Sequence, residues 1–243
     1  MPLASETRLA NDKDPTAAAR SAMAAAVELE VVETARWLGK DKLDPAVIAA
    51  LARVPRHRFV PEHDRAFAYE NRPLPIGHRQ TISQPYIVAL MTDLAAVKPS
   101  DRVLEVGTGC GYQAAILAEL AKRVYSIETV PELAAAAAER LAALGYDTIE
   151  VRHGDGAQGW PEAAPFDAIL VTAAAQRRIP PALLEQLAPG GRLVIPLERG
   201  AGALTWAVGH DQELLLVVKD EAGELQEKSV IPVAFVPLVE RRG

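Results

Sequence analysis

Residues 103–112 read VLEVGTGCGY, and this stretch decides the fold of the chain. Its first four residues predict a short buried strand, and the residues after Gly111 predict a helix. Glycines at 107, 109 and 111 permit a tight turn, and their missing side chains let a ligand approach the backbone. In open parallel sheets, ligands bind at such carboxyl ends of strands. The alternative is a turn that only packs the helix on the strand.

Acidic residues after neighbouring strands favour a ligand site over that alternative. Glu128 ends the next strand, about 20 residues after Gly107, where a carboxylate grips a ribose diol. Asp155 lies between two glycines after the third strand and can accept a hydrogen bond from the amine of adenine. Glu105 suits the amino end of a methionine moiety, directly or through water. The plainer alternatives are a solvated strand end for Glu128, an ordinary turn for Asp155 and a helix-facing surface position for Glu105.

The sixth position of the glycine motif separates two classes of cofactor. Dinucleotide-binding turns have glycine there, because the pyrophosphate comes close to the start of the helix. This chain has Tyr112 instead, and Glu105 would repel a pyrophosphate. Both features favour a single adenosyl group over a nicotinamide dinucleotide.

Strand and helix patterns alternate on both sides of this turn. We expect strands at 102–106, 123–128, 148–152, 166–172 and 192–196, separated by helices at 112–120, 131–144 and 180–187. Repeated strand–helix–strand units imply an α/β fold with a doubly wound, mostly parallel sheet, which is Rossmann-like. After Gly202 we expect strands at 203–208, 213–219 and 229–236 without helices between them, and hence an antiparallel edge.

The N-terminal part predicts helices and an ordered, loop-rich segment. Residues 1–15 read as a loose tail, residues 16–38 as a helix, and Asp44-Pro45 opens a second helix that ends at Val54. Residues 56–80 are rich in proline, and their aromatic residues need burial. A third helix follows Ser83. We expect one domain over 16–243, made of an N-terminal cap (16–80), a cofactor-binding core (81–200) and C-terminal strands (201–243).

Composition excludes several classes of protein. The 243 residues carry a net charge of −6, which argues against a non-specific nucleic-acid binder. The single cysteine, Cys110, cannot form an intramolecular disulfide, and the five histidines lack the spacing of a metal site. No apolar run suits a membrane span, and the N-terminus lacks a secretory pattern. We therefore expect a cytoplasmic monomer without a metal.

Several segments together resemble the protein-L-isoaspartate O-methyltransferase family. Five of them carry the general cofactor pattern: VLEVGTGCGYQAAIL (103–117), VYSIE (124–128), GDGAQGW (154–160), FDAILVTAA (166–174) and PGGRLVIP (189–196). Three are more specific: VPRHRFVPE (54–62), PLPIGHRQTISQPY (73–86) and AFVPL (234–238). The resemblance spans about residues 40–238. It departs from the family at Cys110, where serine is common, and at His78-Arg79, which replaces a smaller pair.

The resemblance implies an activity and a set of site residues. The enzyme would transfer a methyl group from S-adenosyl-L-methionine to the free carboxylate of L-isoaspartyl, and also D-aspartyl, residues in flexible segments of damaged proteins, which starts their repair through a succinimide. The loop Thr81-Ile82-Ser83 would close over cofactor and peptide, with Ser83 in catalysis. Without the resemblance, Ser83 reads as the N-cap of the helix that follows. The predicted cofactor-binding residues are Glu105, Gly107, Thr108, Gly109, Gly111, Glu128, Asp155 and Gly156.

Three other functions are compatible with parts of the sequence. A nicotinamide oxidoreductase is disfavoured by Tyr112. A methyltransferase that acts on a small molecule or a nucleic acid shares the cofactor motifs, although the acidic balance and the absence of an Asn-Pro-Pro-aromatic tetrad disfavour a nucleic-acid substrate. A non-catalytic adenosyl-binding module is disfavoured by the intact loop at 81–83.

Overall fold

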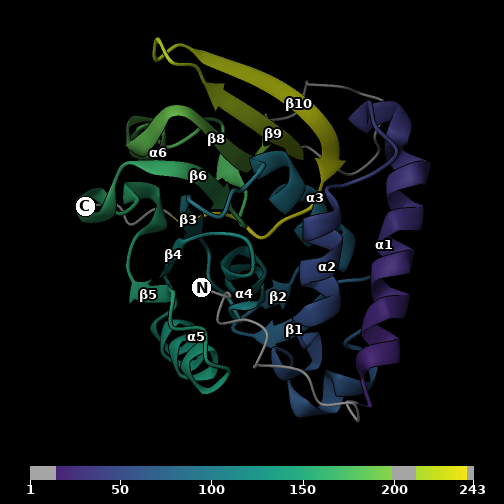
Figure 1. The fold of residues 1–243 in the computed structure, drawn as a ribbon. Coiled ribbons are helices and arrows are strands. Elements are labelled where there is room, and N and C mark those ends of the chain that lie inside the picture. The colour runs from purple at the N-terminus through teal and green to yellow at the C-terminus, as the bar shows by residue number, and fades with distance from the viewer. Residues whose placement is uncertain (1–14, 199–211, 240–243) are drawn as a thin grey trace.

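A computed structural model describes residues 15–198 and 212–239 of the chain (Figure 1). Its main sheet has the strand order β10-β9-β8-β6-β3-β4-β5, with the short strand β7 paired to β8. The strands are β3 (Arg102–Val106), β4 (Arg123–Glu128), β5 (Ile149–His153), β6 (Phe166–Val171), β7 (Ala175–Gln176), β8 (Leu187–Glu198), β9 (Gln212–Lys219) and β10 (Leu225–Val233).

The pairing directions confirm the predicted sheet. Strands β3, β4, β5, β6 and β8 pair in parallel, while β9 pairs antiparallel with both β8 and β10. The chain runs from β3 to β4 and β5 on one side and then returns to β6 on the other side of β3. This reversal of strand order creates the crevice in which ligands of doubly wound sheets bind.

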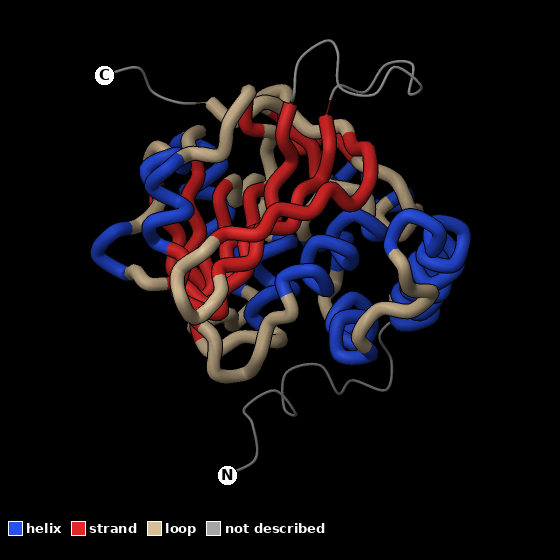
Figure 2. The backbone as a smooth tube through the Cα atoms, turned by 90° about the horizontal axis from the view of Figure 1, so that it is seen from above, coloured by secondary structure: helices blue, strands red, loops and turns tan. Residues whose placement is uncertain are grey.

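Helices cover both faces of the sheet, as Figure 2 shows. Helices α1, α2, α3 and α4 pack in one apolar cluster with Val103, Ala168 and Val194, whereas α6 packs in a second cluster with Leu104 and Ile169. Alternate residues of β3 and β6 thus face opposite clusters. The helices are α1 (Ala17–Leu38), α2 (Pro45–Arg53), α3 (Pro85–Ala95), α4 (Tyr112–Ala118), α5 (Pro131–Ala143) and α6 (Pro181–Gln186), and the short 3-10 helices are η1 (Arg56–Arg58), η2 (Glu62–Phe67), η3 (Gly156–Gln158) and η4 (Pro161–Ala163).

The segment between α2 and α3 contains a hairpin that the sequence pattern did not predict. Strand β1 (Leu74–Gly77) pairs antiparallel with β2 (Gln80–Ile82). The two turn residues, His78 and Arg79, both have positive φ, which is what a type I′ hairpin turn requires. The usual Asn-Gly signal of such a turn is missing here. The expectation of buried aromatic residues was also wrong for Phe67, which is 43% exposed beneath the guanidinium of Arg72.

Other expectations differ from the structure at the ends of elements or lie outside the described residues. Strands β8 and β10 begin five and four residues earlier than expected, at Leu187 and Leu225. The expected tail at 1–15, apart from its last residue, and the expected strand at 203–208 lie outside the described residues. In the described ranges, no helix combines the length and apolarity needed to cross a membrane.

Candidate active site

The glycine turn after β3 has the geometry that its sequence predicts. Gly107, Gly109 and Gly111 all have positive φ, at 98°, 53° and 87°. A Cβ atom added to Gly107 would lie 2.3 Å from Oγ1 of Thr172, which follows β6. Thr172 also donates a 2.6 Å hydrogen bond to the carbonyl of Gly107. The close approach of these two segments therefore requires glycine at position 107.

Glu128 lies beside this turn at the end of β4. Its side chain accepts backbone hydrogen bonds from Gly109 (2.8 Å) and Val130 (2.9 Å). The residue is only 5% exposed, so the alternative of a solvated strand end is wrong. Each carboxylate oxygen keeps a second lone pair. Glu128 and Gly109 also line a small cavity of about 60 Å³.

Gly156 lines the same cavity, and its neighbour Asp155 shapes the backbone there. A Cβ atom on Gly156 would lie 2.4 Å from Cγ1 of Val106, so β3 and the turn after β5 come together only because this residue is glycine. Asp155 accepts a 2.9 Å hydrogen bond from the backbone N–H of Ala157 and caps η3. Asp155 therefore stabilises a turn, as the plainer alternative predicted. Its predicted contact with adenine stays a prediction.

Glu105 is fully buried, so the alternative of a surface position is wrong. The hydroxyl of Ser126 hydrogen-bonds to Oε2 of Glu105, and Thr108 Oγ1 lies 2.5 Å from the same hydroxyl. Oε1 of Glu105 has no hydrogen-bond partner among the described residues. Burial is the main cause that raises the pKa of Glu105 to about 8. The nearby charge of Glu128 also raises it, and the hydrogen bond from Ser126 lowers it. The structure thus keeps a protonatable, partly unsatisfied carboxyl group next to the glycine turn.

The segment Thr81–Ser83 lies between the glycine turn and a larger groove. Thr81 and Ser83 line a cavity of about 40 Å³ together with Gly107 and Gly109. The N-cap reading of Ser83 is wrong, because α3 begins at Pro85 and its N-cap is Gln84, which makes no capping bond with its side chain. The Ser83 carbonyl accepts a 2.8 Å hydrogen bond from Arg56.

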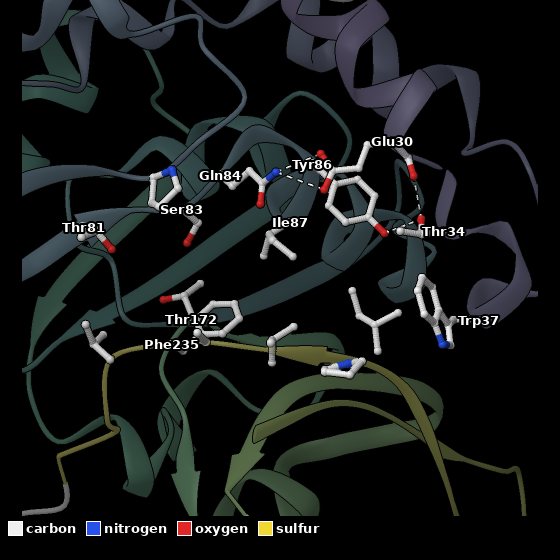
Figure 3. A pocket seen from close by; sticks show the side chains of 16 residues that line it. Glu30, Thr34, Trp37, Thr81, Ser83, Gln84, Tyr86, Ile87, Thr172 and Phe235 are labelled. Carbon is white, nitrogen blue, oxygen red and sulfur yellow. Dashed lines mark hydrogen bonds between the residues drawn. The ribbon is translucent and has the colours of Figure 1, made fainter. Parts of the chain in front are cut away.

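The larger groove has a volume of about 520 Å³, and we call it the α1–β10 groove (Figure 3). One wall comes from α1, another from the start of α3, and a third from β10 and the residues after it. Thr81, Ser83 and Thr172 are at one end, and Trp37 is at the other. Among the described residues that line it, none is basic.

The α1 wall is tied to the start of α3 by a polar network. Gln84 donates to both carboxylate oxygens of Glu30, at 3.2 and 2.9 Å, and Asn71 donates to one of them at 2.6 Å. Thr34 and Tyr86 share a 2.7 Å hydrogen bond between their hydroxyl groups. Burial raises the pKa of Glu30, opposed by the two amide donors.

The sequence interpretation missed two parts of this site. Thr172 was not among the predicted site residues, yet it lines the α1–β10 groove and both smaller cavities. Glu30, Thr34 and Trp37 were part of a segment without any predicted role. Their spacing places them on one face of α1, but an alanine-rich helix gives no signal of what that face contacts. In the part of the chain that the structure describes, no cluster of His, Cys, Asp or Glu could hold a metal ion.

Comparisons with known proteins agree with this arrangement. A family model described as protein-L-isoaspartate(D-aspartate) O-methyltransferase matches residues 30–243. A protein-L-isoaspartate O-methyltransferase 2 of Syntrophobacter fumaroxidans is 57% identical over 225 residues, which cover 93% of this chain and 87% of that protein. The protein of the same name from a Polaromonas species is 56% identical and covers 87% of this chain and 96% of its own length.

A solved structure shares the fold. It is a Plasmodium falciparum protein described as a protein-L-isoaspartate O-methyltransferase, in complex with S-adenosyl-L-homocysteine. The two superpose with a TM-score of 0.73 at 23% identity, over 91% of this chain and 99% of that one. The likeness therefore extends over the cap and the C-terminal strands as well as the central sheet.

Proposed function

The chain belongs to the protein-L-isoaspartate O-methyltransferase family, and from that premise we propose how its residues perform the reaction. The enzyme transfers a methyl group from S-adenosylmethionine to the free carboxylate of L-isoaspartyl, and also D-aspartyl, residues in damaged proteins, which starts repair through a succinimide. One observation carries the assignment of the site. Thr81, Ser83 and Thr172 line both the α1–β10 groove and the space beside the glycine turn, so a substrate group and a cofactor can meet there.

Three observations support S-adenosylmethionine as the group that fits beside the glycine turn. Gly107 and Gly156 stand where a Cβ atom would clash, so bare backbone lines the site. Glu128 keeps free lone pairs for a ribose diol. Glu105 has a buried oxygen without a partner among the described residues, which suits an ammonium group directly or through water. We propose that the adenine lies beside Asp155 and Gly156. The rest of the cofactor would lie along the backbone of residues 107–111.

When bound, this cofactor supplies a methyl group on a positively charged sulfur. The substrate carboxylate has an ordinary pKa of about 4 and is ionised at neutral pH, so its oxygen can attack without a general base. With the cofactor held by the glycine turn, Glu105 and Glu128, the transfer would form a carbon–oxygen bond as the carbon–sulfur bond breaks, and the electron pair would stay on the sulfur. The protein must therefore align the reactants and keep water out. Orientation of this kind is worth up to about 7–11 kcal/mol in ideal cases.

Ser83 is the residue that we assign to catalysis. Its hydroxyl would donate a hydrogen bond to one oxygen of the substrate carboxylate while the other oxygen attacks. Thr81 and Ile82 would complete the binding segment: Thr81 is exposed at the groove, and Ile82 is buried and anchors the segment in the core. A donor that is already in place costs little reorganisation when the reaction occurs.

The α1–β10 groove is the proposed site of the substrate peptide. Residues 231–236 contribute to its lining, which supports a peptide that lies along the end of β10 and the residues after it. An extended peptide in this groove would place its isoaspartyl carboxylate at the hydroxyl-rich end, near Ser83 and Thr172. A substrate of this shape must come from a flexible segment.

We also propose the partners, the location and the domain organisation of the protein. The net charge of −6 supports a protein that acts on other proteins without binding nucleic acid. The single cysteine supports a cytoplasmic location. We also propose that the protein is a monomer, does not bind membranes, and contains one domain over residues 16–243 with the divisions given above.

A labelling experiment tests the proposed function. The protein is incubated with methyl-labelled S-adenosylmethionine and matched peptides that contain L-aspartate, L-isoaspartate or D-aspartate at one position. We expect strong labelling of the L-isoaspartyl peptide, weaker labelling of the D-aspartyl peptide and none of the L-aspartyl peptide. Equal labelling of the isoaspartyl and aspartyl peptides, or labelling of neither, would refute the assigned substrate.

A further inference from the structure

Arg56 is a fully buried cation that contacts the segment assigned to catalysis. It belongs to the stretch VPRHRFVPE and is 0% exposed. Its Nε donates to the carbonyl of Ala68 at 2.9 Å, and its Nη2 donates to the carbonyls of Arg72 at 3.3 Å and Ser83 at 2.8 Å. All three acceptors are uncharged, so the hydrogen bonds leave the positive charge without a counter-ion.

No other described residue neutralises this charge. Within residues 15–198 and 212–239, no carboxylate forms an ion pair with Arg56, and its Nη1 has no hydrogen-bond partner. Its Cζ lies 4.8 Å from the ring centre of Tyr112, whose side chain offsets only part of the effect of burial on the pKa of Arg56. Burial accordingly lowers the pKa of Arg56. Because an unpaired buried charge costs much free energy, an apolar side chain would fill this space more favourably if packing were the only role.

The position of Arg56 links the two halves of the active site. Ser83 lines the α1–β10 groove, and Tyr112 is the first residue of α4, directly after the glycine turn. The substrate group to be methylated is an anion, yet none of the described residues that line the groove is basic, and Glu30 adds a carboxylate. Arg56, one hydrogen bond behind Ser83, is thus a cation close to the end of the groove where the substrate carboxylate reacts.

We propose that Arg56 is a positioning residue for methyl transfer, which holds Ser83 through its carbonyl and supplies the positive charge that favours a carboxylate over a neutral group at that end of the groove. This inference rests on the proposed function. Because Arg56 is fully buried and one hydrogen bond from Ser83, its charge is screened little by solvent.

Two variants of Arg56 separate the role of the charge from that of the planar fork, and a third variant is their control. Arg56→Met removes both the charge and the hydrogen bonds at similar length, and Arg56→Lys keeps the charge but loses the fork. Arg58→Met is the matched control, since Arg58 is an exposed cation in the same short segment. Circular dichroism and the affinity for S-adenosylhomocysteine report whether each variant is folded.

The decisive measurement is the preference for an anion. Calorimetry with bound S-adenosylhomocysteine gives the Kd of an isoaspartyl peptide and of the same peptide with a neutral isoasparagine. We expect Arg56→Met to reduce the ratio of the two affinities by about tenfold or more, and Arg56→Lys to retain it while kcat falls about tenfold. Arg58→Met should change neither quantity.

Several outcomes would overturn the inference. If Arg56→Met weakens the binding of both peptides equally, Arg56 has only a structural role. If Arg56→Lys keeps the kcat of the wild type, its fork does not position Ser83. If Arg56→Met does not fold, the test depends on Arg56→Lys. Because this variant keeps the charge, a loss of its preference for the isoaspartyl over the isoasparagine peptide would refute the role of the charge. A wild-type protein that binds no isoaspartyl peptide would instead refute the proposed function on which the inference rests.

Discussion

Ser83 is placed by residues far from it in the sequence, and its hydroxyl is not used to cap the helix that follows. Gln84 takes the N-cap position of α3, and Arg56 binds the Ser83 carbonyl. The Ser83 side chain lies at the groove, as Figure 3 shows. A small hydroxyl held in this way can orient a carboxylate without removing a proton from it.

Replacing Ser83 by alanine should therefore affect the reaction more than the fold. We expect Ser83→Ala to slow methyl transfer by about tenfold or more, because one oriented hydrogen-bond donor is lost. Calorimetry should find nearly unchanged affinity for S-adenosylhomocysteine, and Ser100→Ala, at an exposed serine, is the control. Normal turnover of Ser83→Ala would remove this residue from the mechanism.

Glu105 makes the stability of the ligand-free protein depend on pH. Its pKa rises from 4.5 to about 8 on folding, so between these values the folded state holds a proton that the unfolded chain has released. The contribution of Glu105 to the free energy of unfolding is therefore greatest below about pH 4.5. It declines as the pH rises from there to about 8. The slope is at most about 1.4 kcal/mol per pH unit.

Replacing Glu105 by glutamine should remove this slope, because the amide stays neutral at every pH. The free energy of unfolding by urea, measured from about pH 5 to about pH 9, should decline more in the wild type than in Glu105→Gln. Glu227→Gln, at an exposed carboxylate on β10, is the control. Parallel pH curves for the wild type and Glu105→Gln would show that this carboxyl group does not titrate as inferred.

At the scale of elements, α1 has two faces with different roles. Met23, Val27 and Val31 pack into the large apolar cluster and fix the helix against the core. Glu30, Thr34 and Trp37 instead line the groove opposite the residues after β10. Since Trp37 and Ser83 lie at opposite ends of the groove, α1 can contribute to peptide binding without touching the reacting atoms (Figure 3).

The indole of Trp37 should bind an apolar residue that flanks the isoaspartyl site. We expect Trp37→Ala to raise KM for isoaspartyl peptides with a nearby leucine by about tenfold, because burial of apolar surface is lost, while kcat changes little. Peptides flanked by glycine should respond less. Leu29→Ala is the control, since Leu29 is 62% exposed and does not line the groove. Equal effects on both peptides would argue against this contact.

At the scale of the whole molecule, the strand order brings the site together. Gly107, Glu128 and Thr172 lie at the carboxyl ends of β3, β4 and β6. Because β3 lies between β4 and β6, the three residues meet although they are far apart in sequence. The same arrangement occurs in dinucleotide-binding folds. The choice of cofactor therefore depends on the residues at this edge and not on the topology.

Ligand-induced stabilisation tests that choice. S-adenosylhomocysteine at about 100 times its Kd should stabilise the protein by about 2.7 kcal/mol and raise Tm by about 5–10 °C for a chain of this size. NAD at the same concentration should leave Tm unchanged. A rise in Tm with NAD alone would favour a dinucleotide enzyme and contradict the assignment of the cofactor.

The sequence by itself determined the features that depend on local chemistry. The parallel strands, the helices between them and the glycine turn follow from apolar periodicity and from positions that only glycine tolerates, and β3 and β4 have the predicted bounds. The placement of Glu128 at the turn follows from the same pattern, because the carboxyl ends of parallel neighbours share one edge.

Only the tertiary structure decided which distant segments touch. Burial of Glu105, the hydrogen bond from Arg56 to Ser83 and the α1 wall of the groove depend on how the cap segments pack against the sheet. The hairpin at 74–82 likewise forms without a local turn signal, since its pairing outweighs the positive φ of His78 and Arg79. Such contacts are set by the free energy of packing between elements, which leaves little trace in the residues next to them.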